Sequence, residues 1–312
     1  IFFLSLFFIP IAKATNIDNC TILNASDTYY LTADIVDSST SECIDVTAND
    51  VVLDCQWHTI DANYTVGAGR GIAVDSVDNI TITNCVVTDW ADLIYMINSD
   101  NDNFSNIILN NSNGADGIWC AGSNNTVLTN ITATYNGNDG IFLSHCDYSN
   151  LIDIVADYNT NGIEAETSVF NMFTDIQASY NNYGIWLIEM NNNFISNSIA
   201  SGNVEGLLIE SSDGNTITNS TFNYNTYCGI VFDSSPNNII TNSTSNNNTN
   251  CGIYLESSSN NTIINSTFNY NDYGISLGSS SNNTIISSTS NYNNYEGIYL
   301  YSSSNNTIIN ST

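Results

Sequence analysis

The sequence predicts an all-β fold, a single-stranded right-handed parallel β-helix of about eleven coils, each 22 or 23 residues long. Three observations predict it: a glycine followed by Ile or Leu recurs at this spacing, polar columns recur in step with it, and apolar residues between them alternate with period 2. The glycines are Gly117, Gly140, Gly162, Gly184, Gly206, Gly229, Gly252, Gly274 and Gly297. From each glycine except the last, 19 residues lead to an Asn, so the length varies only in the short turn before the next glycine.

The polar columns predict the turns of each coil. Thirteen residues after each glycine stands a second polar column, which includes Asn197 and Asn219, and four residues before it lies a third column that is all Asn from Asn171 to Asn306. Stacked Asn side chains can hydrogen-bond along a column, and Asn tolerates the left-handed backbone of sharp corners. We therefore expect ladders of polar side chains at the turns.

The apolar columns predict short strands around a core. The residues one and three after each glycine are apolar, as is the residue two before the second polar column. A coil cannot bury its own apolar face, so it stacks about 4.8 Å from its neighbours with its strands in parallel. Parallel crossovers are overwhelmingly right-handed. A leucine-rich horseshoe fits less well, because its helices need helix formers that this Asn-, Ser- and Thr-rich sequence lacks.

The chain is expected to have three parts. Residues 1–14 form an apolar stretch too short to span a bilayer, ending in the small-x-small pattern Ala12-Lys13-Ala14, which predicts a partial signal peptide. Residues 15–49 fit no coil and are expected to form an N-terminal cap, and residues 50–312 carry the coils. We expect a secreted or cell-surface protein without a membrane span in its mature part. The first residue, Ile1, and the last, Thr312, which falls within a repeat, indicate a fragment.

The charge narrows the choice of partners. Lys and Arg total 2 against 31 Asp and Glu, for a net charge of −29. This balance disfavours nucleic acid, anionic polymers and acidic lipid surfaces. The 16 Asn-x-Ser/Thr sequons, among them Asn63, Asn103 and Asn219, would suit a glycoprotein, although we expect several of them to be buried in the ladders.

Eight cysteines, an even number, fit an oxidising compartment. The candidate disulfide cysteines are Cys20 with Cys43 and Cys228 with Cys251. Cys228 and Cys251 each precede a glycine and are 23 residues apart, which stacks them one above the other. Cys55 and Cys85 lie near one another in the first coils, whereas Cys120 and Cys146 are out of register and are expected to be free.

Residues two and four after each glycine point outward and supply the candidate site. The candidate ligand-binding residues are Trp119, Phe142, Glu164, Glu166, Trp186, Glu210, Asp233, Tyr254, Glu256 and Tyr299. Aromatic rings on a flat sheet can stack on sugars, so a polysaccharide or cell-surface glycan is the expected partner. The alternative is that the aromatics serve as strand formers and the acids are simply solvated. No residue is assigned a catalytic role.

No cofactor is predicted. Glu210, Asp233 and Glu256 stand in successive coils, where calcium would relieve their repulsion, but solvent screening would suffice. The histidines His58 and His145 and the three methionines are too scattered for a copper site.

The segments VVLDCQWHTIDA at 51–62 and NITITNC at 79–85, with the repeated NNTIINST and GIYL units, resemble right-handed β-helix proteins of the NosD-like, pectate-lyase-like superfamily over residues 43–312. That superfamily includes polysaccharide lyases, hydrolases, epimerases, a copper-centre accessory protein and surface repeats. The resemblance implies that a lyase would use an Arg or Lys base on an acidic polysaccharide, and the mature chain offers only Arg70. A glycosidase needs a carboxylate pair, which acids two apart on one strand provide at about 6.7 Å.

Two functions remain open from the sequence. The preferred one is a non-enzymatic, exported surface or adhesion rod that binds carbohydrate on its aromatic and acidic outer face. The alternative is a carbohydrate-active enzyme, a glycoside hydrolase rather than a lyase. A purely structural rod is the third option.

Overall fold

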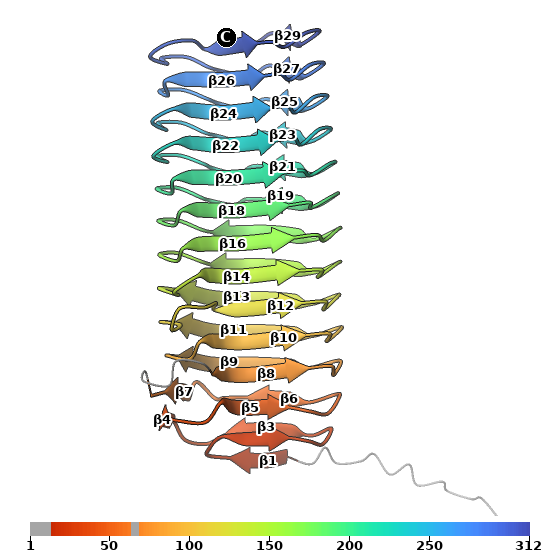
Figure 1. The fold of residues 1–312 in the computed structure, drawn as a ribbon, viewed down its shortest axis with the longest axis vertical. Coiled ribbons are helices and arrows are strands. Elements are labelled where there is room, and N and C mark those ends of the chain that lie inside the picture. The colour runs from red at the N-terminus through yellow and green to blue at the C-terminus, as the bar shows by residue number, and fades with distance from the viewer. Residues whose placement is uncertain (1–13, 64–68) are drawn as a thin grey trace, which may run out of the picture.

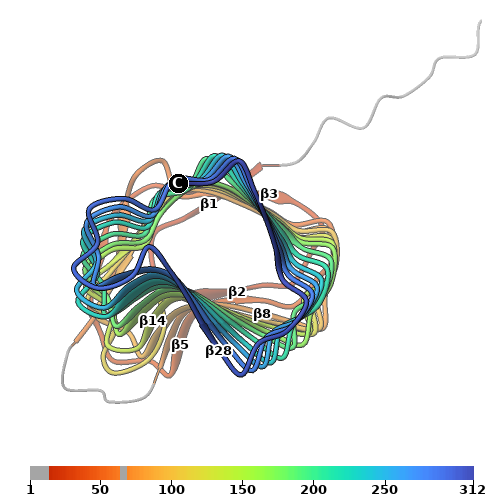
Figure 2. The ribbon, with the colours of Figure 1, turned by 90° about the horizontal axis from the view of Figure 1, so that it is seen from above.

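A computed structural model describes residues 14–63 and 69–312, which wind into a straight rod of stacked coils (Figure 1). The described residues form 29 strands in two sheets, and every pairing between them is parallel. They contain no helix, and therefore no helix that could cross a membrane. Seen from above, the two sheets face each other across the interior (Figure 2).

Each coil contributes a strand to each sheet. The 16-stranded sheet comprises β1 (Ala14–Ile17), β3 (Thr28–Leu31), β4 (Ile35–Ser38), β6 (Val52–Asp54), β7 (Thr59–Ala62), β9 (Thr81–Thr88), β11 (Asn103–Asn110), β13 (Val127–Thr134), β15 (Asn150–Val155), β17 (Met172–Gln177), β19 (Phe194–Ser196), β21 (Thr216–Thr218), β23 (Ile239–Thr241), β25 (Thr262–Ile264), β27 (Thr284–Ile286) and β29 (Thr307–Ile309). The 13-stranded sheet comprises β2 (Thr21–Leu23), β5 (Glu42–Val46), β8 (Arg70–Asp75), β10 (Asp92–Ile97), β12 (Ile118–Ala121), β14 (Asp139–Ser144), β16 (Asn161–Glu166), β18 (Tyr183–Ile188), β20 (Glu205–Glu210), β22 (Cys228–Asp233), β24 (Cys251–Glu256), β26 (Tyr273–Gly278) and β28 (Ile298–Tyr301).

The core lies between the sheets and consists of the predicted apolar columns. Ile163 and Ala165 of β16 and Phe173 of β17 are completely buried, as are their counterparts in the neighbouring coils. The strands are short and alternate inward and outward, which is the pattern of period 2 in the sequence. The right-handed parallel β-helix is confirmed.

The N-terminal segment corrects one expectation. Residues 15–49 were expected to fit no coil, but they contain β1 to β5, and β2 pairs with β5, which in turn pairs with β8. In the 13-stranded sheet, eleven strands run from β8 to β28 and match the eleven coils expected from the repeat. Strands β2 and β5 extend this sheet toward the N-terminus. The segment that we expected to form the N-terminal cap thus lies at the end of the stack and contributes strands to both sheets. The predicted signal peptide falls almost entirely outside the described residues.

Asparagine ladders connect successive coils, as expected. The backbone N–H of Asn193 donates to Oδ1 of Asn215 at 2.8 Å, and that of Asn215 donates to Oδ1 of Asn238 at 2.7 Å. The side-chain amide of Asn215 donates to the carbonyl of Met190 at 2.8 Å. Each buried Asn therefore satisfies backbone groups that no strand pairs.

The second polar column differs from these ladders. Asn197 and Asn219 adopt the left-handed backbone, with φ of 53° and 51°, and are exposed. None of the sixteen sequon asparagines is buried, because in sequons such as the one at Asn260 the buried ladder residue is the next one, Asn261. The expectation that several sequons are buried was therefore wrong.

Three disulfides join neighbouring coils. They are Cys20–Cys43, Cys55–Cys85 and Cys228–Cys251, with Cα–Cα distances of 4.3, 4.8 and 4.6 Å. Both candidate pairs are thus present, together with the pair expected to lie close in the first coils.

Candidate functional site

The outer surface of the 13-stranded sheet, which we call the outer face, carries three columns of outward side chains. These are the residues one before, two after and four after the glycine position. The middle column runs in register through Trp119, Phe142, Glu164, Trp186 and Leu208 and continues to Tyr254. The face therefore changes its chemistry from one coil to the next along the rod.

All ten predicted ligand-binding residues lie on this outer face. Glu166, Glu210, Asp233 and Glu256 occupy the column four after the glycine, and the other six occupy the middle column. In the structure, these ten residues do not form a single site. Trp119, Phe142 and Glu164 meet at one hollow, whereas Tyr254 and Tyr299 line another one nearer the C-terminus.

The first hollow, which we call the acidic groove, has a volume of about 390 Å³. Its lining residues are Asp92, Ala115, Asp116, Trp119, Asn138, Asp139, Phe142 and Glu164. The rings of Trp119 and Phe142 lie 6.3 Å apart at 45°, and Tyr95 meets Trp119 edge-on at 4.7 Å. The groove thus joins an aromatic wall to a row of carboxyl groups.

Hydrogen bonds hold these carboxyl groups in place. Oδ1 of Asp116 accepts from Nδ2 of Asn138 and from the backbone N–H of Asp139, both at 2.9 Å. Nδ2 of Asn161 donates at 2.9 Å both to Oδ1 of Asp139 and to Oε2 of Glu164. Asp116 and Asp139 are only 8% and 1% exposed. Their positions are therefore fixed before any ligand arrives.

The same burial shifts the protonation of the groove. Burial, reinforced by the charges of Asp116 and Glu164, raises the pKa of Asp139 to about 8. Burial, with the charge of Asp116, raises the pKa of Asp92 to about 6. Burial also raises the pKa of Asp116 and of Glu164. At neutral pH the groove therefore contains a protonated Asp139 beside a mostly ionised Asp92.

The sequence interpretation missed Asp92, Asp116 and Asp139. A signal was present, because an Asp directly precedes the glycine, or Leu93 in its place, in three successive coils. In later coils the same column holds Cys228 and Cys251, so its residues predicted a disulfide rather than a row of carboxyl groups on the outer face.

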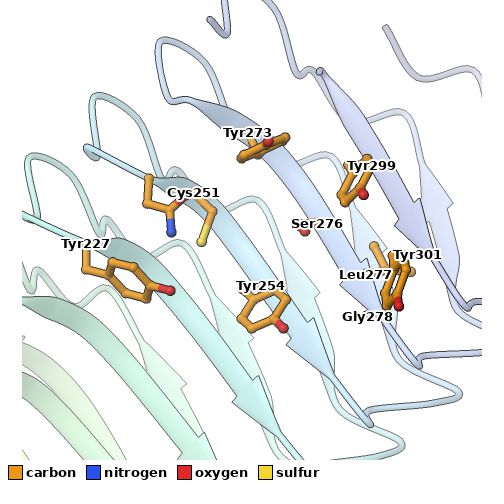
Figure 3. Close-up of a pocket in the computed structure, with 10 residues that line it drawn as sticks. Tyr227, Cys251, Tyr254, Tyr273, Ser276, Leu277, Gly278, Tyr299 and Tyr301 are labelled. Carbon is orange, nitrogen blue, oxygen red and sulfur yellow. The ribbon is translucent and has the colours of Figure 1, made fainter. Parts of the chain in front are cut away.

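A second hollow of about 370 Å³, the tyrosine hollow, lies further along the outer face (Figure 3). Tyr227, Tyr254, Tyr273, Tyr299 and Tyr301 surround it. The hydroxyl of Tyr254 donates to Glu256, and burial together with this carboxylate raises the pKa of Tyr254 to about 12. The phenol of Tyr254 is therefore neutral at neutral pH.

Arg70, the base that a lyase would need, is already engaged. Its Nη1 donates to Oε1 of Glu42 at 2.9 Å, and its guanidinium lies 3.4 Å from the ring centre of Tyr95. It is the only Lys or Arg among the described residues. The arrangement neutralises this guanidinium with groups of the protein itself.

Two of the three acids whose repulsion calcium would relieve also have hydrogen-bond partners within the chain. Glu210 accepts a hydrogen bond from Nε1 of Trp186 at 2.8 Å, and Glu256 accepts one from Tyr254. Within residues 14–63 and 69–312, no three His, Cys, Asp or Glu side chains are grouped as a metal site requires.

The sequence matches a known family model. The model describes a right handed beta helix region, and it matches residues 70–208 and 162–312, which together exceed half of the chain. The chain belongs to the right-handed β-helix family. No curated protein matches this β-helix protein in sequence.

Solved structures share its fold. The periplasmic alginate epimerase AlgG is 13% identical, with a TM-score of 0.54, covering 93% of this chain and 78% of its own. The catalytic domain of a GH87 α-1,3-glucanase variant in complex with tetrasaccharides is 16% identical, with a TM-score of 0.59, covering 96% of this chain and 63% of its own. At such identities the likeness establishes the fold of this β-helix protein, and it agrees with the pectate-lyase-like resemblance.

Proposed function

We propose that this β-helix protein is an exported rod that binds an uncharged glycan in the acidic groove. The observation that carries this proposal is the groove itself, where Trp119 and Phe142 stand beside hydrogen-bonded carboxyl groups in a hollow of about 390 Å³. Aromatic rings offer flat apolar surfaces to sugar rings, and fixed polar groups orient sugar hydroxyls. Three disulfides between coils fit an oxidising location outside the cell.

The charge of the groove favours a neutral glycan over an acidic one. A polyuronate would bring its carboxylates toward Asp92, Asp116 and Glu164, and Arg70 is paired with Glu42. A protonated Asp139 can donate a hydrogen bond to a hydroxyl, and the ionised acids can accept one. The tetrasaccharide-bound α-1,3-glucanase among the similar structures supports a glycan as the ligand class.

Trp119→Ala is expected to weaken glycan binding at least tenfold, because it removes the largest ring of the groove. A glycan array would first identify a bound oligosaccharide, and calorimetry with that oligosaccharide would then compare the variant with the native protein. Trp186→Ala, three coils along the same column, should give a smaller loss.

Tyr224→Ala is the matched control, since this tyrosine is 66% exposed and does not belong to the outer face. Equal binding by the native protein and the Trp119 variant would contradict the proposal. Binding of polyuronates alone would contradict the preference for neutral glycans.

Glycoside hydrolysis is the second candidate, and the raised pKa of Asp139 favours it. A glycosidase needs one protonated and one ionised carboxyl group at the scissile bond, and different surroundings must separate their pKa values. In the groove, Asp139 would supply the proton, and Asp92, whose pKa of about 6 leaves it mostly ionised at neutral pH, would serve as the ionised partner.

Asp139→Asn is expected to lower any hydrolytic rate about a hundredfold or more while the glycan still binds, because the amide keeps the shape but has no proton to transfer. The native rate should fall as the pH rises through about 8, where Asp139 loses its proton. Release of reducing ends from the bound glycan would be the measurement, with Glu166→Gln on the same face as control. Binding without turnover by the native protein would exclude this candidate.

A further inference from the structure

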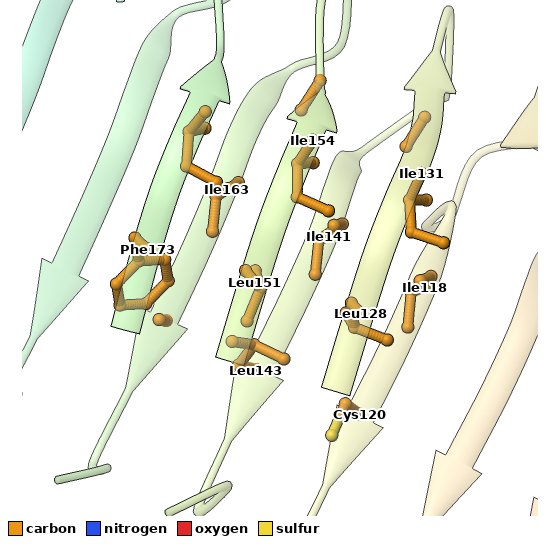
Figure 4. Close-up of a cluster of buried hydrophobic side chains, with 14 of the residues drawn as sticks. Ile118, Cys120, Leu128, Ile131, Ile141, Leu143, Leu151, Ile154, Ile163 and Phe173 are labelled. Atoms are coloured by element: carbon orange, nitrogen blue, oxygen red, sulfur yellow. The ribbon is translucent and has the colours of Figure 1, made fainter. Parts of the chain in front are cut away.

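Two cysteines outside the three disulfides lie in contact inside the core. Cys120 is on β12 and Cys146 is in the turn after β14, and both are fully buried. Their sulfur atoms are 2.6 Å apart. Figure 4 shows Cys120 among the apolar side chains of the interior, in line with Leu143 of the next coil.

The repeat explains why these two residues meet. In later coils, a serine at the position of Cys146 donates to the backbone carbonyl of the residue at the position of Cys120, one coil earlier. The pairs are Ser235 with Ile209, Ser258 with Phe232 and Ser280 with Leu255, at 2.9, 3.1 and 3.1 Å. The first two pairs are 26 residues apart, as are Cys120 and Cys146.

Cys146 keeps the other contact of that serine column as well. Its backbone N–H donates to Oγ of Ser168 at 2.8 Å, just as that of Ser235 donates to Ser258. As expected, Cys120 and Cys146 are free and out of register with one another, since Cys120 pairs with Leu143. They nevertheless stand in two columns that also lie close together in later coils, where the serine of one column reaches the backbone carbonyl of the other.

We propose that Cys120 and Cys146 form a fourth disulfide of the mature protein. The three other disulfides also join neighbouring coils, with separations of 23, 30 and 23 residues. The oxidant would be a small-molecule or protein disulfide. One sulfur attacks it and releases one thiol, and the second cysteine then attacks the mixed disulfide and releases the other, so the oxidant carries away two electrons and two protons.

The surroundings limit when these steps can take place. In the folded protein the hydrogen bond from Cys120 lowers the pKa of Cys146, whereas burial raises that of Cys120. Because Cys146 is fully buried beneath the next coil, the exchange must take place before that coil closes over it.

The cross-link would lie directly behind the acidic groove. Cys120 follows Trp119 on β12, and Phe142 and Leu143 occupy the matching positions of β14. A bond from Cys120 to the turn after β14 would therefore tie together the two coils whose outward rings form the aromatic wall. This inference does not depend on the identity of the ligand.

Thiol counting on the full chain tests the proposal. The protein would be refolded with glutathione and glutathione disulfide, denatured without reductant, alkylated with iodoacetamide and mapped by mass spectrometry. We expect no alkylated cysteine and a peptide pair linked through Cys120 and Cys146. Alkylation of both residues in molecules that carry the Cys228–Cys251 link would overturn the proposal, as would a link from either residue to another cysteine.

A double variant gives a second measurement, because each cysteine is replaced by a residue that stands at the same position in other coils. Cys146→Ser matches the serine column and Cys120→Leu matches Leu143, so the double variant keeps the core filled. We expect it to unfold at a lower temperature than the native protein without reductant, and at the same temperature when both are fully reduced. A difference of the same size under both conditions would show that packing, rather than a bond, causes it.

Discussion

Gly162→Ala is expected to destabilise the rod by about 3 kcal/mol, near the upper end of the usual cost of overpacking a core. A Cβ at this position would lie 2.5 Å from the carbonyl oxygen of Gly184 and 2.9 Å from that of Ala156. Both neighbours are backbone atoms, so neither can turn aside as a side chain could. The added methyl group must push neighbouring coils apart.

Urea unfolding, followed by circular dichroism, would measure this loss. Gly114→Ala is the control, because no atom lies within 4 Å of a Cβ there and only the positive φ of 85° opposes the substitution. That control should cost about 1 kcal/mol. An equal loss in the two variants would mean that the close approach of the coils is not what requires glycine.

Asp102→Asn is expected to stabilise the protein by about 3 kcal/mol at pH 7, the free energy that corresponds to its shifted pKa. Asp102 is 1% exposed and heads the column that is Asn from Asn171 onward. Its Oδ1 accepts from the backbone N–H of Ile80 at 2.8 Å, as the asparagines of the ladder do, but Oδ2 has no partner. An amide there could donate to a backbone carbonyl, as Asn215 donates to Met190.

The effect should depend on pH in a defined direction. Burial raises the pKa of Asp102 from 3.8 to about 6, although hydrogen bonds from Ser99 and Ile80 oppose the shift. The folded state therefore holds the proton more tightly than the unfolded state does. The native protein loses stability from this group as the pH rises from about 4 to 6, and the penalty is complete above pH 6.

Urea unfolding of the native protein and the variant at pH 4 and pH 7 would measure this difference. The gain should be largest at pH 7 and should shrink at pH 4, where Asp102 is mostly protonated in the folded state. Asp175→Asn, in the exposed column where other coils have Asn, should leave stability unchanged within about 0.5 kcal/mol. A gain of the same size at both pH values would contradict the proposed role of ionisation.

The coils were predictable because each one repeats the same pattern of inward, outward and turn residues. Inward residues such as Ile163 and Phe173 recur at fixed distances from the glycine, so each coil supports the interpretation of the next. The N-terminal coils were not recognised because the marker is missing there. Cys43 stands in register with Gly71, and Cys20 with Cys43, so a disulfide pair occupies the glycine position.

The site could be predicted only in part. The period-2 alternation of inward and outward residues correctly placed Trp119, Phe142 and Glu164 on the outer face. This placement depends only on the distance of each residue from its glycine in the sequence. Asp116 and Asp139 are buried instead in the folded rod, where the amide groups of Asn138 and Asn161 from the next coils hold their carboxyl groups. This burial raises their pKa values, and no spacing in the sequence reveals it.

The separation of inward and outward columns has a consequence for how such a protein can evolve. The ladders and the core fix what every coil must share, but they place no demand on the three outward side chains. Duplication or loss of one whole coil would change the length of the rod while leaving every ladder continuous. Exchange of outward residues would alter the surface at a single height, so new binding surfaces can arise coil by coil on an unchanged scaffold.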